Sequence, residues 1–165
     1  MLNNLFPYPA KKLIKRTADY LLHDTVKPKV GSVLHCRLPA VAEHTGIYVG
    51  NGKVIELNGK GNIVKIPLSK FTGDFTPRIG ILIYVACDEN EKVLYSNTIS
   101  DRAFKKVGSK RDYNLLLDNC HQFTCGAITG EFENKNNYFW MVERCIKKHY
   151  SVKKVKWRAI HSDLY

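Results

Sequence analysis

Three side chains of this 165-residue sequence have the types that nucleophilic catalysis at a carbonyl group requires. Cys120 supplies a sulfur that can attack a carbon, His44 an imidazole that can take its proton, and Glu56 a carboxylate that can orient the imidazole. Such a set predicts acyl transfer or hydrolysis through a covalent thioacyl intermediate. Because the three residues lie far apart in sequence, the prediction depends on the elements that carry them.

Cys120 is predicted to begin a short helix that stops at Gly130, a residue suited to the position after a helix end. Asp118 or Asn119 can cap its N-terminus. In the first helical turn, unpaired N–H groups and the helix dipole favour a thiolate and can stabilise an oxyanion beside it. Asn119 and His121 are therefore candidates for contact with the substrate or the oxyanion.

His44 and Glu56 belong to two strands joined by a Gly-Asn-Gly turn. A two-residue turn would place Glu56 on the face opposite His44, because side chains alternate between faces. A three-residue loop over 50–52 instead pairs Val49 with Lys53 and puts His44 and Glu56 on one face of adjacent strands. We favour this second register.

The second register also separates apolar from polar side chains. One face then carries only apolar residues, namely Ile47, Val49, Ile55 and Leu57. The other carries His44, Gly46, Tyr48, Val54, Glu56 and Asn58. Tyr48 is thus a further candidate for substrate contact. The alternative interpretation is that His44 and Glu56 are two polar residues on a solvated sheet face.

The elements around these motifs predict an α+β domain with an antiparallel sheet. Five short segments rich in Val, Ile and Tyr, separated by turn residues, are typical of antiparallel strands: SVLHCRL, HTGIYVG, KVIELN, NIVKIP and ILIYVAC. Helical periodicity follows at about 99–107, 120–129 and 137–149. Strands followed by helices favour α+β over alternating βαβ units, with the sheet packed against the helix that bears Cys120.

The length and the lack of a linker predict one domain over residues 1–165. We divide it into an N-terminal segment (1–28) with an amphipathic basic helix at 10–23, a catalytic core (29–130), and a C-terminal helix with a basic tail (131–165). The basic helix can lie on an anionic membrane surface or pack its apolar stripe on its own domain.

The positive net charge indicates anionic partners but does not identify their class. Lys and Arg number 26 against 15 Asp and Glu, a net charge of +11, which suits lipid headgroups, acidic substrates or nucleic acid, or simply a solvated surface. Nucleic acid is disfavoured because no zinc-finger spacing or RNA-binding aromatic motif is present. No apolar run is long enough to span a membrane and no secretory signal is recognisable. We therefore expect a cytoplasmic protein that can also contact a membrane peripherally.

The five cysteines predict reduced thiols. Their number is odd and no C-x-x-C pair occurs, so neither a disulfide framework nor structural zinc is expected, and no cofactor or metal is required. Four of them fall within apolar strands or helices and are interpreted as small buried hydrophobes: Cys36, Cys87, Cys125 and Cys145.

Two stretches resemble a known family, EHTGIYVGNGKVIELNG (43–59) and AFKKVGSKRDYNLLLDNCHQFTCGAITG (103–130). They are similar to the lecithin:retinol acyltransferase-like family, a circularly permuted relative of the NlpC-type, papain-like thiol hydrolases. The family signature is a His at the start of a Tyr-Val-Gly hairpin and an Asn-Cys-Glu-His-Phe motif that opens a helix. Here these positions read His44 and Asn119-Cys120-His121-Gln122-Phe123, and with KVGSVLHC (29–36) the resemblance covers about 29–130.

The resemblance implies a papain-like fold with Cys120 as nucleophile, His44 as base and a third polar residue that orients the base. Many members have a second His at the third position, where this sequence has Glu56. Lipid acyl esters are the substrate class that the family implies. Without the hydrophobic C-terminal anchor of the animal enzymes, the chain looks like soluble bacterial members. The alternatives are an amidase or peptidase of NlpC type, or a non-catalytic module that binds anionic membrane or nucleic acid.

Overall fold

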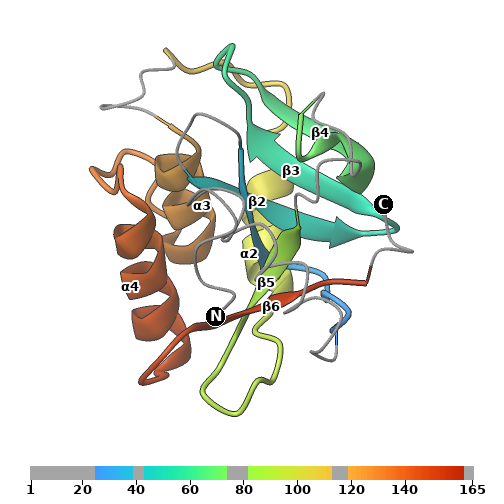
Figure 1. Ribbon diagram of the computed structural model, residues 1–165. Helices are drawn as coiled ribbons and strands as arrows, with labels where there is room; N and C mark the ends of the chain where they lie inside the picture. Colours follow the sequence, from blue (N-terminus) through green and yellow to red (C-terminus); the bar gives the residue numbers. More distant parts are fainter. Residues whose placement is uncertain (1–24, 39–42, 74–81, 113–118, 162–165) are drawn as a thin grey trace, which may run out of the picture.

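The computed structural model describes residues 25–38, 43–73, 82–112 and 119–161. Within these ranges, six strands form one antiparallel sheet in the order β4-β3-β2-β1-β5-β6 (Figure 1), which confirms the predicted α+β class. The strands are β1 (Val33–Arg37), β2 (Glu43–Gly50), β3 (Lys53–Leu57), β4 (Ile63–Pro67), β5 (Ile83–Cys87) and β6 (Lys156–Ala159). The helices are the 3-10 turn η1 (Leu68–Lys70), α2 (Asn97–Phe104), α3 (Cys120–Thr129) and α4 (Phe139–Tyr150).

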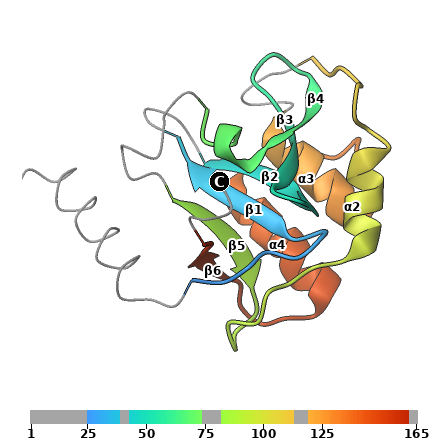
Figure 2. The same ribbon diagram turned by 90° about the vertical axis from the view of Figure 1, so that its right-hand side faces the viewer.

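The sheet buries apolar side chains on both faces, because its strands alternate two apolar sets. One set packs under α2, α3 and α4, which Figure 2 shows together on one side of the sheet; it includes Ile47, Ile55 and Leu57. The opposite face holds a second cluster, which includes Tyr48, Val54 and Phe71. The predicted separation of the hairpin's two faces is therefore confirmed.

The β2–β3 turn differs in detail from the prediction. Gly50, rather than Val49, pairs with Lys53, so the turn has two residues. Asn51 and Gly52 both have positive φ, 51° and 62°, as a tight hairpin turn of this hand requires. A β-bulge between Tyr48 and Gly50 absorbs the extra residue, and from the Tyr48–Val54 pair onward the register is the one predicted. The bulge thus reconciles a two-residue turn with a shared face for His44 and Glu56.

Strand β6 is an element that the sequence pattern did not predict. It lies within the segment interpreted as a basic tail and pairs antiparallel with β5, from Tyr84–Ala159 to Cys87–Lys156. The prediction of a basic tail is therefore wrong for residues 156–159, which form the edge of the sheet.

The predicted helix at 10–23 lies outside the described residues. In the part of the chain that the structure describes, no helix has the length and apolarity to cross a membrane.

Candidate active site

The N-terminus of α3 holds Cys120 in its first turn because Asn119 caps the helix. The Asn119 side-chain oxygen accepts hydrogen bonds from the backbone N–H of His121 (2.9 Å) and of Gln122 (3.4 Å). Its amide nitrogen donates to the backbone carbonyl of Asn137 at 2.9 Å, which ties the cap to the segment that leads into α4. At the other end Gly130 closes the helix with a φ of 91°, as predicted. Asp118, the other predicted cap, lies outside the described residues.

The β2–β3 hairpin brings His44 and Glu56 together. Nε2 of His44 lies 2.7 Å from Oε2 of Glu56, and both side chains are largely buried, 13% and 10% exposed. The imidazole packs against the ring of Phe71, with centroids 4.9 Å apart. A glycine is needed at position 46 between the strands, since an added Cβ would lie 2.9 Å from Phe71 and 3.0 Å from the backbone oxygen of Ile55. This packing restricts the orientation of the His44 ring.

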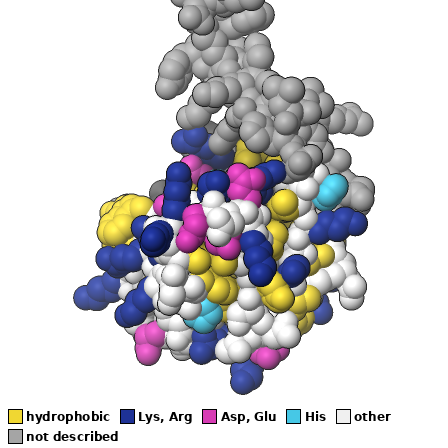
Figure 3. Space-filling model, turned by 90° about the horizontal axis from the view of Figure 1, so that it is seen from below, with side chains coloured by type: hydrophobic (Ala, Val, Ile, Leu, Met, Phe, Trp, Pro, Cys, Tyr) yellow, Lys and Arg dark blue, Asp and Glu magenta, His cyan; other side chains and the backbone are white. Residues whose placement is uncertain are grey.

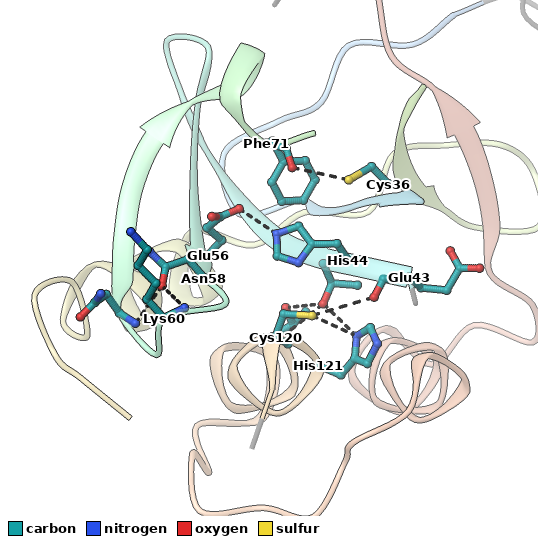
Figure 4. Close-up of polar contacts among 12 residues, drawn as sticks. Cys36, Glu43, His44, Glu56, Asn58, Lys60, Phe71, Cys120 and His121 are labelled. Carbon is teal, nitrogen blue, oxygen red and sulfur yellow. Dashed lines mark hydrogen bonds and ion pairs between the residues drawn. The ribbon is translucent and has the colours of Figure 1, made fainter. Parts of the chain in front are cut away.

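His44 lies between Glu56 and Cys120, and its ring extends from the one toward the other (Figure 4). A side-chain interaction with Cys120 raises the pKa of His44, and its effect on that pKa is larger than the effect of Glu56. No dashed line joins the ring to the sulfur in Figure 4, so this contact is looser than the His44–Glu56 hydrogen bond. Catalytic hydrogen bonds in unliganded enzymes are often long in this way.

The pKa values of this pair favour an ionised form. Burial alone would lower the pKa of His44, but hydrogen bonding to Cys120 and to Glu56 outweighs it and raises the pKa to about 10. Burial alone would raise the pKa of Cys120, but hydrogen bonding to His121 and His44 outweighs it and holds the pKa well below the ordinary thiol value of 9.0. Both shifts favour a thiolate beside an imidazolium.

His121 is a second imidazole beside the sulfur. Its Nδ1 lies 3.8 Å from Sγ of Cys120 and 3.2 Å from the hydroxyl of Thr45. That hydroxyl also lies 3.3 Å from the backbone oxygen of Cys120 and accepts a hydrogen bond from Thr124 at 3.0 Å. Thr45 therefore links β2 to the first turn of α3. Sequence analysis missed it, although its position directly after His44 on the strand implies that it faces the helix side.

The sequence candidates do not all reach the sulfur. Tyr48 lies four residues along β2 from His44, about 13 Å at the usual rise of a strand. Its hydroxyl accepts a hydrogen bond from the backbone N–H of Gly52 at 3.3 Å, in the turn at the far end of the hairpin. The predicted contact of Tyr48 with substrate is therefore not supported. Asn119 is close to Cys120, but its side chain serves as the helix cap.

A second histidine–carboxylate pair borders the site. His35 of β1 contacts the carboxylate of Glu43, whose backbone oxygen lies 4.0 Å from Sγ of Cys120. The ring of His35 is buried among aromatic rings, with centroid distances of 4.4 Å to Phe139 and 5.3 Å to Trp157. Phe139 also approaches His121, at 6.1 Å. These rings form one wall of the site and connect it to α4 and β6.

Cys36 and Cys87 differ from Cys120 in their surroundings. All five thiols are free and buried. Burial raises the pKa of Cys36 well above its ordinary value and that of Cys87 to about 11, so neither ionises at neutral pH. Among the described residues, no group of three or more His, Cys, Asp or Glu side chains is arranged to hold a metal ion.

The geometry can therefore generate a sulfur nucleophile, with a proton donor and acceptor beside it and a helix N-terminus behind it. A sequence model described as lecithin retinol acyltransferase matches residues 26–133. The match includes the whole β2–β3 hairpin and all of α3, and it ends before α4 and β6. A search of curated proteins finds no match.

Proposed function

Since this chain belongs to the lecithin retinol acyltransferase family, whose members act in general as acyltransferases or hydrolases on lipid and acyl substrates, we propose that it is a thiol acyltransferase or hydrolase that uses Cys120 as nucleophile. The proposed substrate is an acyl ester of a lipid. The observation that carries the proposal is the arrangement of Glu56, His44 and Cys120, in which the carboxylate holds one ring nitrogen of the histidine at 2.7 Å and the ring extends toward the sulfur.

The first half of the proposed reaction forms a thioester. The Cys120 thiolate attacks the ester carbonyl carbon, and the carbonyl π electrons move to oxygen to give a tetrahedral oxyanion. When this intermediate collapses, the bond to the ester oxygen breaks and the His44 imidazolium donates its proton to the departing alkoxide. The acyl group is then bound to sulfur, and His44 is neutral.

The second half returns the enzyme to its starting state. Neutral His44 accepts a proton from water, an alcohol or an amine, and the acceptor oxygen or nitrogen attacks the thioester carbon. Collapse of the second tetrahedral intermediate expels the thiolate and leaves an imidazolium again. Water gives hydrolysis, whereas an alcohol or amine gives transfer. Glu56 stabilises the imidazolium in both halves and keeps its own proton state.

We assign stabilisation of the oxyanion to the backbone N–H of Cys120. The neighbouring N–H groups of His121 and Gln122 already donate to the Asn119 side chain, so the amides first expected to be free are engaged. The Cys120 amide lies at the positive end of the α3 dipole and next to the carbon that the sulfur attacks. Nδ1 of His121 lies 3.8 Å from the sulfur. We assign the His121 side chain as a further donor to the oxyanion.

The test is direct observation of the acyl-enzyme. The protein is exposed briefly to a phosphatidylcholine with two defined acyl chains, and its intact mass is measured. The expected result is an increase by one acyl group, mapped by peptide analysis to Cys120 and lost in Cys120→Ser. Cys36→Ser, which removes a buried thiol with a raised pKa, is the matched control and should keep the adduct. Turnover by Cys120→Ala at the wild-type rate would refute the proposal.

The same experiment separates lipid from peptide substrates. NlpC-type relatives of the family cleave peptides with the same chemical groups, so muropeptides are incubated in parallel with the phospholipid vesicles. Adducts and products from vesicles alone support the ester reaction. Products from muropeptides alone would replace the proposed substrate while keeping Cys120 as the nucleophile.

A further inference from the structure

A cleft of about 630 Å³ lies at the opposite end of α3 from the nucleophile. It is lined by Thr129, Asn136, Arg144, Cys145, Lys148 and His149. Thr129 is the last residue of α3, about 13 Å along the helix axis from Cys120 at 1.5 Å per residue. The cleft is therefore separate from the candidate active site.

The lining of the cleft contains three basic side chains and no carboxylate. Arg144, Lys148 and His149 are all exposed on the last two turns of α4. Figure 3 views the molecule from the side on which α4 ends, and basic side chains clearly outnumber acidic ones there. Such a lining attracts anions from solution.

The charges of Arg144 and Lys148 remain available for a ligand. Among the described residues, neither Arg144 nor Lys148 forms an ion pair with a carboxylate. Glu143, the nearest acidic residue in sequence, accepts a hydrogen bond from the indole N–H of Trp157 at 2.8 Å instead. The Arg144 guanidinium stacks over the ring of Trp140 at 5.2 Å, and one of its nitrogens lies 3.4 Å from the side-chain oxygen of Asn136. These interactions hold the guanidinium in place without neutralising it.

One thiol that lines the cleft is affected by this positive charge. A hydrogen bond from Cys125 lowers the pKa of Cys145, and Arg144 and Lys148 lower it further against the effect of burial. Burial and the nearby charge of Arg102 lower the pKa of His149. The effect of Arg144 and Lys148 on Cys145 has the sign expected where an anion would be stabilised.

We infer that this cleft is a second binding site, separate from the active site, for a ligand that carries a phosphate group. A phosphate has several acceptor oxygens and up to two negative charges, which match one planar guanidinium, one ammonium and one imidazole that becomes charged when the anion binds. A lipid headgroup and a soluble phosphate compound share this chemistry. The inference does not rest on the proposed reaction, because binding can be measured without turnover.

The first experiment uses inorganic phosphate as the probe and the ring signals of His149 in NMR as the readout. The expected result is a saturable shift and a higher pKa of His149 in the bound state, because a neighbouring anion favours the imidazolium. Lys148→Glu should weaken binding about tenfold, because it replaces an attractive charge beside the phosphate with a repulsive one. Lys147→Glu is the matched control, since it makes the same charge change at the preceding exposed position outside the cleft.

The second experiment separates the two sources of phosphate. Phosphatidylcholine vesicles that contain phosphatidic acid are compared with vesicles given the same negative charge by oleate. Preference for phosphatidic acid, lost in Lys148→Glu and kept in Lys147→Glu, identifies a lipid headgroup. Saturable binding of inorganic phosphate without that preference identifies a soluble compound. The inference is overturned if neither response occurs, or if both lysine variants lose binding equally, which would indicate only general surface charge.

Discussion

Nε2 of His44 and Oε2 of Glu56 lie 2.7 Å apart on neighbouring strands, and both side chains are largely buried. The carboxylate is thus in a position to hold the ring at one nitrogen, so that the other side of the ring is presented to Cys120. In many family members a second histidine is expected at the position of Glu56, and a carboxylate adds a negative charge that a neutral imidazole would not. The consequences of this charge are open to measurement.

Glu56→Gln should lower activity and shift its pH dependence. The reactive form needs an ionised thiol and a protonated His44, whose pKa of about 10 sets the alkaline limit. Glu56 helps to raise that pKa, so its removal should move the alkaline limb of a kcat/KM profile to lower pH, and kcat should fall by about 10²-fold or more. Glu131→Gln, the same change at an exposed carboxylate beyond α3, should leave the profile unchanged. An unmoved alkaline limb in Glu56→Gln would contradict the assigned role.

Cys120→Ala should lower the pKa of His44. Interaction with the thiolate is the largest effect that raises this pKa, and without it the effect of burial, which lowers the pKa, is opposed by Glu56 alone. NMR titration of the ring should show His44 ionising well below pH 10 in the variant. His149, at the other end of the helical layer, provides an internal reference that should not move. A titration still centred near pH 10 would show that His44 and Cys120 do not interact.

His121→Gln should make the nucleophile less reactive in acid. The hydrogen bond from His121 is the strongest influence that lowers the pKa of Cys120, so its loss should raise that pKa. The rate of alkylation by iodoacetamide at pH 6 should fall, and the rate at pH 9 should change little. His121→Glu, which restores the residue of the family motif, should slow alkylation at pH 6 further, because a negative charge opposes the thiolate. Equal rates in all three proteins would remove His121 from the site.

Thr45→Val should destabilise the fold, because it removes the hydroxyl that links β2 to α3. Thr45 is fully buried, and the substitution removes the hydrogen bonds that its hydroxyl makes with the Cys120 carbonyl and the Thr124 hydroxyl, a cost of about 1–3 kcal/mol in the free energy of unfolding. Urea unfolding provides the measurement. Thr129→Val is a matched control: its hydroxyl also bonds a backbone oxygen, that of Cys125, but the residue is exposed, so we expect a smaller loss. Because Thr45 and Thr124 are bonded to each other, their combined substitution should cost less than the sum.

Much of the fold could be predicted because local signals were strong. Asn119 and Gly130 are typical residues for the start and end of a helix, and both have these roles around α3. The alternation of apolar residues in the hairpin predicted which side chains share a face. It could not predict the bulge at Val49, because a two-residue turn with a bulge and a three-residue loop give the same register beyond the turn.

Other features depend on interactions between distant segments. Strand β6 has only four residues, two of them charged, and its pairing with β5 rather than its composition makes it a strand. The hydroxyl of Thr45 and the backbone oxygen of Asn137 contribute to the site only through the way α3 and the segment before α4 pack on the sheet. Tyr48 shares the hairpin face of His44, but four residues of strand separate them, and its hydroxyl lies at the turn end of the hairpin.

Strand β6 comes after all the other described elements in the chain, yet its Trp157 packs against Phe139 and His35 in the wall beside the site. During synthesis, therefore, Cys120, His44 and Glu56 all leave the ribosome before this wall can be completed. A growing chain that has reached only α4 lacks the indole that closes the aromatic cluster. The order of translation thereby delays assembly of the complete surroundings of Cys120 until residues 156–159 have joined the edge of the sheet.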